Sequence, residues 1–442
     1  MFLTDNDIDK WRATWLRTEG GDPAAPLRNN LKRNGLWRQS QVAGRNWPMG
    51  CVALEITQRC NLDCTLCYLS PMSEAVRNLP LDEIFRRIDN IRSRYGPGIP
   101  VQVTGGDPTL RNRGELVRIV KRIADRGLVP ALFTNGIRAT RELLGELAAV
   151  GLVDVAFHVD MTQERNGFAS ETALNKVHLE YIERARGLPL SVIFNTTVFR
   201  GNFDEIPDLA RFFKSHADVV DMAAFQLQAD TGRGTLRARD KTISQDTVVK
   251  KIREGAGTAL NFDTVTLGHP DCNKYATCIE TGGTLYDLLD DAALIHGLFE
   301  AAASFTFDRR SRWKALCTIF AVGIRRPGQI GPCLRFAVRK IRAMRRDLWK
   351  ARGRVHKLSF FVHNFMDAAK LERSRCESCV FMAATGEGLI SMCVHNAKRD
   401  QFILRSGRVK TPDGPAPILP LKRLKGRARA AALAQKTKSA SV

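Results

Sequence analysis

The chain has 442 residues, of which 44% are hydrophobic, so it is long enough to bury a large core in two or three domains. Its 68 Lys and Arg residues against 46 Asp and Glu residues give a net charge of +22, which favours phosphate-bearing partners such as nucleic acid, anionic lipid headgroups or a phosphorylated substrate. No run approaches about eighteen uninterrupted apolar residues and no secretory signal pattern is present, which argues against a membrane span and against a disulfide framework for the eleven cysteines.

The N-terminal segment over 1–50 is polar and is predicted to be helical. From Val52 onward, short β-rich runs alternate with longer amphipathic stretches. The β-rich runs cover 52–56, 101–103, 131–133, 153–159, 192–198 and 224–227. Strands separated by helices predict right-handed crossovers and a parallel sheet over 51–235. The pattern is compatible with an open doubly wound sheet and with a partial barrel.

Three further regions follow the predicted sheet. Residues 236–355 are expected to form a helical basic region, in which 309–357 carries many Lys and Arg residues interleaved with apolar ones and a single acid, Asp347. Residues 356–410 are expected to form a C-terminal cysteine-bearing domain with an auxiliary metal site. Residues 411–442 are rich in Pro, Gly, Ala and basic residues, which predicts a basic flexible tail.

Cys60, Cys64 and Cys67 lie on one short loop directly after the first predicted strand. Three thiolates can ligate three irons of a [4Fe–4S] cluster and leave the fourth iron open to a small molecule. A zinc knuckle or a buried thiol cluster is the alternative. Zinc requires a fourth ligand, and none lies in this loop.

Polar and glycine residues follow the later predicted strands as well. Gly105, Gly106, Asp107 and Pro108 follow the second one, where the glycines permit close backbone approach to a ligand and the carboxylate can accept a hydrogen bond from an ammonium group. Taken alone, this stretch also suits an ordinary turn. The remaining candidates for a cofactor site are Thr134, Asn135, Asp160, Asn195 and Gln226. Ligand sites gather at the carboxyl ends of parallel strands, although each of these residues also suits a strand-end cap or turn.

The Cys-x3-Cys-x2-Cys spacing of the cysteine loop resembles the signature of the radical S-adenosylmethionine (SAM) superfamily. The stretch 105–108 is similar to that family's Gly-Gly-Glu-Pro motif, with Asp107 in place of Glu, and 134–136 is similar to its Thr-Asn-Gly. The resemblance implies a partial (βα)6 barrel, a [4Fe–4S] cluster on the three cysteines, and SAM chelated by the open iron and contacted at its amino group by the second motif. It also implies a 5′-deoxyadenosyl radical and a reducing electron donor of the flavodoxin or ferredoxin type.

The later cysteines include a second group with metal-ligand spacing. Cys376 and Cys379 are separated by two residues and Cys393 follows, which predicts an auxiliary iron–sulfur cluster or a mononuclear iron or zinc site. The fourth ligand is expected from Cys272, with Cys278 and Cys333 as alternatives. Buried structural thiols are the other interpretation.

Residues 361–368, 376–379 and 386–396 resemble the C-terminal block of one radical SAM subgroup. This subgroup contains the archaeal tetraether lipid synthase and the dihydropterin methylases of methanopterin biosynthesis. The resemblance implies that hydrogen abstraction from an unactivated carbon leads to carbon–carbon coupling, methylation or desaturation.

The basic–apolar segment favours a lipid chain as substrate and an anionic membrane surface as partner, although a solvated basic face is an equal alternative. We therefore expect a cytoplasmic protein that is peripheral at the inner face of the membrane. The first functional alternative is methylation of a pterin-like heterocycle. The second is RNA modification, for which no RNA-binding module is recognisable. The sequence assigns no catalytic side chain.

Overall fold

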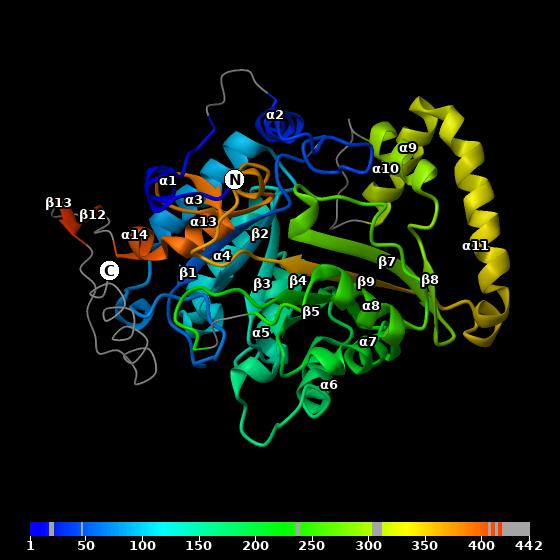
Figure 1. Ribbon diagram of the computed structural model, residues 1–442, viewed down its shortest axis with the longest axis horizontal. Coiled ribbons are helices and arrows are strands. Elements are labelled where there is room, and N and C mark those ends of the chain that lie inside the picture. Colours follow the sequence, from blue (N-terminus) through cyan, green and yellow to red (C-terminus); the bar gives the residue numbers. More distant parts are fainter. Residues whose placement is uncertain are drawn as a thin grey trace.

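The computed structural model describes residues 1–16, 22–45, 47–235, 239–302, 312–404, 408–411 and 414–417. Most of its strands belong to one large sheet (Figure 1). These strands are β1 (Cys51–Thr57), β2 (Pro100–Gly105), β3 (Val129–Thr134), β4 (Asp154–His158), β5 (Ser191–Val198), β6 (Val220–Leu227), β7 (Asn273–Thr281), β8 (Thr284–Asp287), β9 (His356–Asn364), β10 (Phe381–Ala384) and β11 (Leu389–Ser391). A separate two-stranded sheet pairs β12 (Arg408–Thr411) with β13 (Gly414–Pro417).

The centre of the large sheet confirms the predicted α/β fold. The strand order is β11-β10-β1-β2-β3-β4-β5-β6-β9-β7-β8, and β1 to β6 are parallel neighbours in chain order. A doubly wound sheet would reverse its order at one point, whereas a barrel adds each new strand beside the previous one. The observed order is therefore that of a partial barrel, whose edges are not joined by a hydrogen-bonded pair of the described strands.

Helices cover the outer face of the sheet and supply the crossovers. The described α-helices up to β9 are α1 (Asp5–Lys10), α2 (Ala25–Arg33), α3 (Leu81–Tyr95), α4 (Arg113–Asp125), α5 (Arg141–Ala149), α6 (Asn175–Ala185), α7 (Ile206–Ser215), α8 (Gln245–Ala256), α9 (Ala292–Ala301), α10 (Arg312–Arg325) and α11 (Ile330–Lys350). Helix α3 shows why they form, since Ile84, Ile88 and Ile91 recur at helical spacing and are fully buried against the sheet. The side chain of Asn112 caps α4 by accepting a hydrogen bond from the backbone N–H of Glu115.

The outer parts of the chain differ from the sequence-based expectation. The range 236–355, expected to be helical, also contains β7 and β8. The range 356–410 supplies strands to both ends of the large sheet, since β9 pairs with β6 while β10 pairs with β1. It adds three short helices, α12 (Arg373–Glu377), α13 (Met392–Ala397) and α14 (Arg399–Ile403). The tail predicted over 411–442 lies outside the described residues except for 411 and 414–417.

The two ends of the curled sheet meet through side chains. Phe361 on β9 lies 6.0 Å from Phe381 on β10, measured between ring centroids, and His363 lies 4.4 Å from the same ring. Because β9 and β10 stand near opposite ends of the strand order, these aromatic contacts form a closing seam. At this seam, Cys272 lies close to Cys379 and Cys393, which stand before and after β10.

Candidate functional site

The three cysteines of the first loop follow β1 and are partly exposed. The loop is tied to the segment after β4 by Thr65, whose backbone N–H donates to the carbonyl of Thr162 at 2.8 Å. The loop is thus attached across the sheet to the segment that follows β4. This arrangement places the three thiols at the carboxyl end of the parallel strands, where the sequence predicts them.

The segment after β6 forms a strap across the cysteine loop. The backbone N–H of Arg233 donates to the carbonyl of Cys67 at 3.0 Å, and that of Thr235 donates to the carbonyl of Thr65 at 2.7 Å. Gly232 and Gly234 flank this strap, and a Cβ atom added to Gly232 would stand 2.4 Å from the Cys67 carbonyl oxygen. The strap therefore requires glycine in order to lie flat on the loop.

The side chain of Arg233 is buried beneath the cysteine loop. It is 2% exposed, and its guanidinium donates to Ser73 Oγ at 3.1 Å and to the carbonyl of Leu62 at 3.2 Å. It also lies 3.8 Å from the carboxylate of Asp63 and 3.4 Å from that of Glu74. Sequence analysis missed this residue, although the Gly-Arg-Gly run was a visible signal of a tight backbone contact.

Gly105 and Gly106 serve the packing of the loop itself. The backbone N–H of Gly106 donates to the carbonyl of Thr57 at 2.9 Å, and that of Asp107 donates to the carbonyl of Arg59 at 2.8 Å. A Cβ atom on Gly106 would stand 1.9 Å from the Arg59 carbonyl oxygen, and Gly105 adopts a φ of +125°. These glycines therefore let β2 approach the chain between β1 and Cys60.

Asp107 is fully buried and already holds four protein donors. Its Oδ1 accepts hydrogen bonds from the backbone N–H of Thr109, at 2.9 Å, and from the Thr109 hydroxyl. Its Oδ2 accepts one from the Thr134 hydroxyl and one from the backbone N–H of Asn135, both at 2.8 Å. An ionised carboxylate offers about four acceptor positions, and all four of Asp107 are occupied by these donors. Asp107 therefore links the ends of β2 and β3 by hydrogen bonds. Pro108 opens the short 3-10 turn Pro108–Leu110 that follows.

Asn135 connects this linkage to the cysteines. Its side-chain amide donates to Asn61 Oδ1 at 2.7 Å and approaches the Cys60 sulfur at 3.9 Å. Asn135 therefore contacts both Asp107, through its backbone N–H, and Cys60, through its side-chain amide.

Asp160 repeats the arrangement of Asp107 at the end of β4. Its Oδ1 accepts from the backbone N–H of Thr162, at 2.9 Å, and its Oδ2 accepts from the backbone N–H of Thr197 on β5, at 2.8 Å. The same Oδ2 is hydrogen-bonded to His158 Nε2 at 2.6 Å. The side chain of His158 is 35% exposed, and it was not among the predicted site residues.

Asn195 and Gln226 share one face of the sheet. Asn195 is paired in register with His158, whereas Gln226 is paired with Thr197 on one side and with His363 on the other. Side chains alternate between faces along a strand, so Asn195 and Thr197 point to the same side as Gln226. Asn195 is buried and Gln226 is partly exposed. The predicted polar residues of β5 and β6 are therefore brought together with His158.

The first cysteine set has the number of thiolates that a [4Fe–4S] cluster with one open iron requires. Across the described residues, no group of three or more His, Cys, Asp or Glu side chains is placed to hold one metal ion. A [4Fe–4S] cube distributes three thiolates over three irons, so it does not need them to converge on one point. Burial raises the pKa of Cys60 to about 11, and burial together with Cys67 and Asp160 raises that of Cys64. Ligation would therefore release protons from these thiols.

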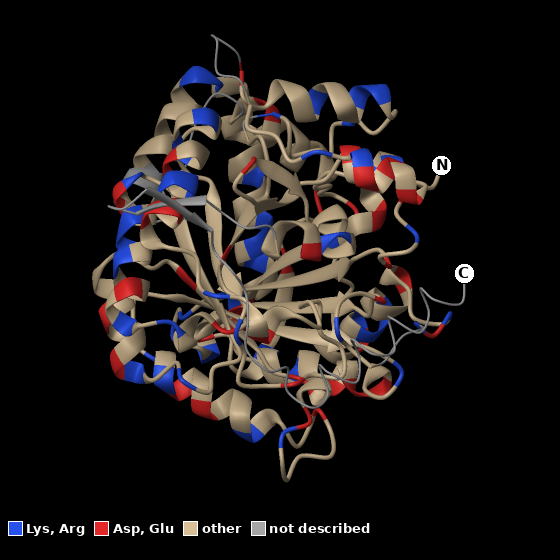
Figure 2. Cartoon of the chain, turned by 90° about the vertical axis from the view of Figure 1, so that its left-hand side faces the viewer, with Lys and Arg blue, Asp and Glu red and all other residues tan. Residues whose placement is uncertain are grey.

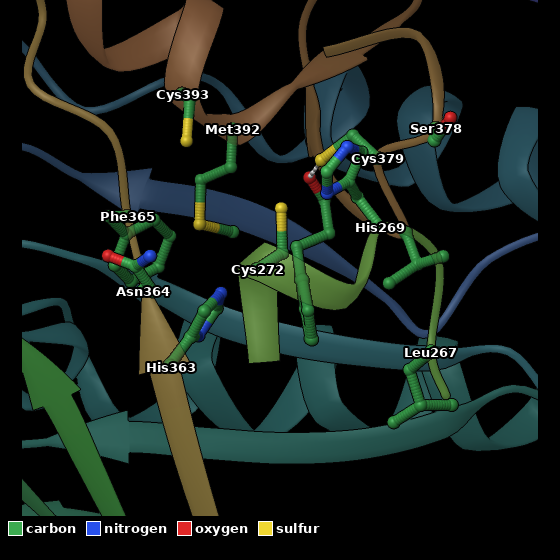
Figure 3. Close-up of a pocket in the computed structure, with 12 residues that line it drawn as sticks. Leu267, His269, Cys272, His363, Asn364, Phe365, Ser378, Cys379, Met392 and Cys393 are labelled. Carbon is green, nitrogen blue, oxygen red and sulfur yellow. Dashed lines mark hydrogen bonds between the residues drawn. The ribbon is translucent and has the colours of Figure 1, made fainter. Parts of the chain in front are cut away.

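The second set of cysteines lies at the closing seam (Figure 3). Cys376 belongs to α12, Cys379 precedes β10, Cys393 belongs to α13, and Cys272 immediately precedes β7. Cys272, Cys379 and Cys393 line one small cavity, and their sulfurs project into it beside Met392. Three of the four predicted cysteines, from segments far apart in the sequence, thus line one cavity, and Cys376 lies outside its lining.

Burial is the main cause of the raised pKa values of the thiols in this second set, and neighbouring thiols add to it. Burial raises the pKa of Cys393 to about 12, with a further increase from Cys379, and burial raises that of Cys272 to about 11. Burial and the neighbouring thiols also raise the pKa of Cys376. The Arg375 guanidinium donates to the Cys272 sulfur at 3.3 Å, which favours the thiolate at this position.

Two alternatives for the fourth ligand lie elsewhere. Cys278 is buried within β7, where its thiol donates to the carbonyl of Leu358, and Cys333 lies on α11. Neither lines the cavity at the seam. His269 and His363 do line it, and the pKa of His363 is lowered to about 3 by burial, which keeps its ring neutral.

Part of the chain is similar in sequence to known proteins. The model of the radical SAM superfamily matches residues 54–213. PqqA peptide cyclase of Bradyrhizobium diazoefficiens is 32% identical over 224 residues, which cover 48% of this chain and 57% of that protein. The 7,8-dihydro-6-hydroxymethylpterin dimethyltransferase of Methanocaldococcus jannaschii is 29% identical over 186 residues, covering 41% of this chain and 36% of that one.

A solved structure is also similar. It is the crystal structure of Streptococcus suis SuiB bound to S-adenosylmethionine, with 13% identity, a TM-score of 0.38, and coverage of 50% of this chain and 48% of that chain. The chain spans about half the length, or less, of the relatives named here.

Proposed function

We propose that the chain is a radical SAM enzyme and that Cys60, Cys64 and Cys67 hold a [4Fe–4S] cluster with one iron open to SAM. Support comes from the match of the radical SAM superfamily model to residues 54–213. When bound, such a cluster would supply the electron for reductive cleavage of a C–S bond of SAM, which gives methionine and a 5′-deoxyadenosyl radical. This radical would take a hydrogen atom from an unactivated carbon. A flavodoxin or ferredoxin is the proposed reductant. The observation that carries this proposal is the set of three thiols on one loop, attached to the carboxyl ends of β2, β4 and β6.

We assign the cofactor-facing roles to residues that surround this loop. Thr134, Asn135, Asn195 and Gln226 are proposed to line the SAM site, together with the backbone of 105–108. Asp107 is proposed to act as a positioning residue through Thr134 and Asn135, because its four acceptor positions are filled by protein donors. Asp160 has the matching role for His158 and Thr197.

The proposed substrate is a lipid chain. Hydrogen-atom abstraction is suited to such a chain, because an unactivated C–H bond carries neither an acidic proton nor a carbonyl group to polarise. The proposed reactions on this chain are carbon–carbon coupling, methylation or desaturation. The proposed location is the cytoplasmic face of a membrane. Support comes from the exposed apolar and basic side chains of α10 and α11.

A pterin-like heterocycle is the second candidate substrate. It is favoured by the similarity to the dihydropterin dimethyltransferase, whose name states methyl transfer to a pterin. A polar heterocycle would not require the exposed apolar side chains of α11, whereas a lipid chain in a membrane would use them.

We also propose that Cys272, Cys376, Cys379 and Cys393 hold an auxiliary metal site at the closing seam, either an iron–sulfur cluster or mononuclear iron or zinc. Its support is the cavity lined by Cys272, Cys379 and Cys393, and the neutral imidazole of His363 on the wall of that cavity. Cys376 does not line the cavity, but its pKa is raised by burial and by the neighbouring Cys393, Cys379 and Cys272. Cysteine thiolates and a neutral imidazole are ligands that both metals accept.

The test of the central proposal is SAM cleavage. Protein reconstituted without oxygen and reduced with dithionite should convert SAM to 5′-deoxyadenosine and methionine, and Cys64→Ala should abolish this conversion. Persistent cleavage in Cys64→Ala would refute the assignment. Lipid profiles of a deletion strain and its parent would then separate a lipid substrate from a pterin, since only the former predicts a missing lipid species.

A further inference from the structure

The outer side of α11 carries two parallel rows of side chains. The apolar row consists of Leu334, Val338, Ile341 and Trp349, which are 62%, 45%, 57% and 85% exposed. The basic row consists of Arg335, Arg339, Arg342, Arg346 and Lys350. Arg335, Arg339, Arg342 and Lys350 each follow a member of the apolar row by one residue. Arg346 follows Arg345, an exposed arginine that stands in the apolar row between Ile341 and Trp349. The two rows therefore run side by side along the helix.

The opposite side of α11 attaches the helix to the protein. Lys340 and Met344 are buried, and Lys340 Nζ lies 2.7 Å from the carboxylate of Asp290. The Tyr286 hydroxyl on β8 donates to Asp347 at 2.8 Å. The helix is therefore held in a fixed rotation about its axis, and both rows face away from the protein. Figure 1 shows α11 at the outer edge of the molecule.

The positive charge of the basic row is only partly neutralised. Arg339 pairs with Asp290 at 2.8 Å and Lys350 approaches Asp347 at 3.4 Å. Arg335, Arg342 and Arg346 form no ion pair with any described residue. Like charges three or four residues apart on a helix repel one another, so the row favours an anionic partner. On the side of the molecule opposite α11, Figure 2 shows both basic (blue) and acidic (red) residues on the outer helices.

Exposed apolar side chains are concentrated in the same part of the chain. Among the described residues, nine of the fourteen large exposed apolar side chains lie between 313 and 355. Helix α10, directly before α11, contributes Trp313, Phe320 and Ile324, at 75%, 72% and 65% exposure. Scattered single apolar residues are normal on a surface, but a concentration of this kind marks an interaction site.

We propose that this α10–α11 surface docks the protein on an anionic membrane, with α11 lying in the plane of the lipid headgroups. The apolar row enters the acyl boundary, and the basic row meets the phosphates beside it. A nucleic acid could neutralise the basic row, but it would leave the apolar row in water. No described helix is long and apolar enough to cross a bilayer, and the 21 residues of α11 give a contact about 30 Å long.

This inference deepens the proposed function, since it rests on the lipid substrate proposed there and gives that substrate a route to the enzyme. Docking itself requires neither cluster nor SAM. Failure of vesicle binding would therefore leave SAM cleavage untouched, and failure of SAM cleavage would leave vesicle binding untouched.

The test is co-flotation of the full chain with vesicles of phosphatidylcholine alone or mixed with phosphatidylglycerol. The wild type should bind the mixed vesicles, and Arg342→Gln/Arg346→Gln should bind them roughly 30-fold more weakly, as two surface charges predict. The matched control is Arg113→Gln/Arg211→Gln, which removes two exposed charges from α4 and α7 and should retain wild-type binding. Leu334→Ser/Trp349→Ser should weaken the binding that persists at high salt.

Three results would overturn the proposal. The first is no binding to either vesicle, and the second is equal loss in the α11 and control variants. The third is tight binding of a single-stranded RNA that depends on Arg342 and Arg346 but not on Trp349, which would assign the basic row to nucleic acid. Far-ultraviolet circular dichroism of each variant verifies that the fold is retained.

Discussion

Asp107, after β2, accepts a hydrogen bond from the hydroxyl of Thr134 at the end of β3, with 2.8 Å between Oδ2 and Oγ1. Both residues are buried, so the bond is shielded from water. Asp107→Asn replaces one acceptor oxygen by an amide that faces donors, and should cost about 2–4 kcal/mol of unfolding free energy. Chemical denaturation of the metal-free protein measures this loss.

Thr134→Val is a milder change at the same site as Asp107→Asn. It removes one of the four hydrogen-bond donors and leaves the carboxylate of Asp107 in place. We expect about 1 kcal/mol of destabilisation. SAM affinity should fall in both variants in the same order as stability. If Asp107→Asn lowered SAM affinity with no change in unfolding free energy, Asp107 would instead contact the SAM amino group directly.

Glu171 makes stability depend on pH. Burial, together with the nearby Asp160, raises the pKa of Glu171 to about 8, and its Oε1 accepts hydrogen bonds from Asn202 and the backbone of Met161. The folded chain keeps this proton, whereas an unfolded chain releases it near pH 4.3. Stability from this group is therefore present below about pH 4.3 and is lost as the pH rises to about 8, at up to roughly 1.4 kcal/mol per pH unit.

Glu171→Gln should remove that slope, because glutamine resembles the protonated acid and does not titrate. Urea denaturation between about pH 5 and 8 should show a smaller decline for the variant than for the wild type. Glu180→Gln is the control, since its carboxylate is 58% exposed. An identical decline in the wild type and Glu171→Gln would show that the group is ionised throughout this range.

Sequence patterns were sufficient to predict the strands at the centre of the sheet but not the strands at its edges. The strands β1 to β6 are short buried runs between amphipathic helices, a pattern that predicts parallel order from local residues alone. Strand β7 mixes buried and partly exposed positions, and no crossover helix precedes it. Its antiparallel pairing with β9 could therefore not be predicted from the sequence pattern. The two cysteine sets had recognisable spacing. Arg233 and His158 had no comparable motif, since their roles depend on Cys67 and Asp160 being folded against them.

The two cysteine sets should bind metal independently. The first set lies on the loop after β1, whereas Cys272, Cys379 and Cys393 of the second set line the cavity at the closing seam. Iron and zinc analysis of Cys60→Ala/Cys64→Ala/Cys67→Ala should still show metal at the seam. Cys376→Ala/Cys379→Ala should lose that metal and keep the iron of the first loop. Complete loss of metal in the first variant would argue against an auxiliary site.

The glycine strap over the cysteine loop should be needed for cluster retention. Gly232 has a φ of +64°, and a Cβ atom there would collide with the carbonyl of Cys67, which accepts the backbone N–H of Arg233. Gly232→Ala must therefore push the strap away from the loop and move the guanidinium of Arg233 with it. We expect the variant to retain several-fold less iron after desalting, measured as iron per chain.

Gly35→Ala separates this steric effect from backbone strain. Gly35 has nearly the same φ, +67°, but nothing lies within 4 Å of a Cβ atom there. Both variants pay about 1 kcal/mol for a positive φ, and only Gly232→Ala also meets the cysteine loop. Iron retention should therefore be normal in Gly35→Ala. Equal iron in the two variants would mean that the loop holds its ligands in place without the strap.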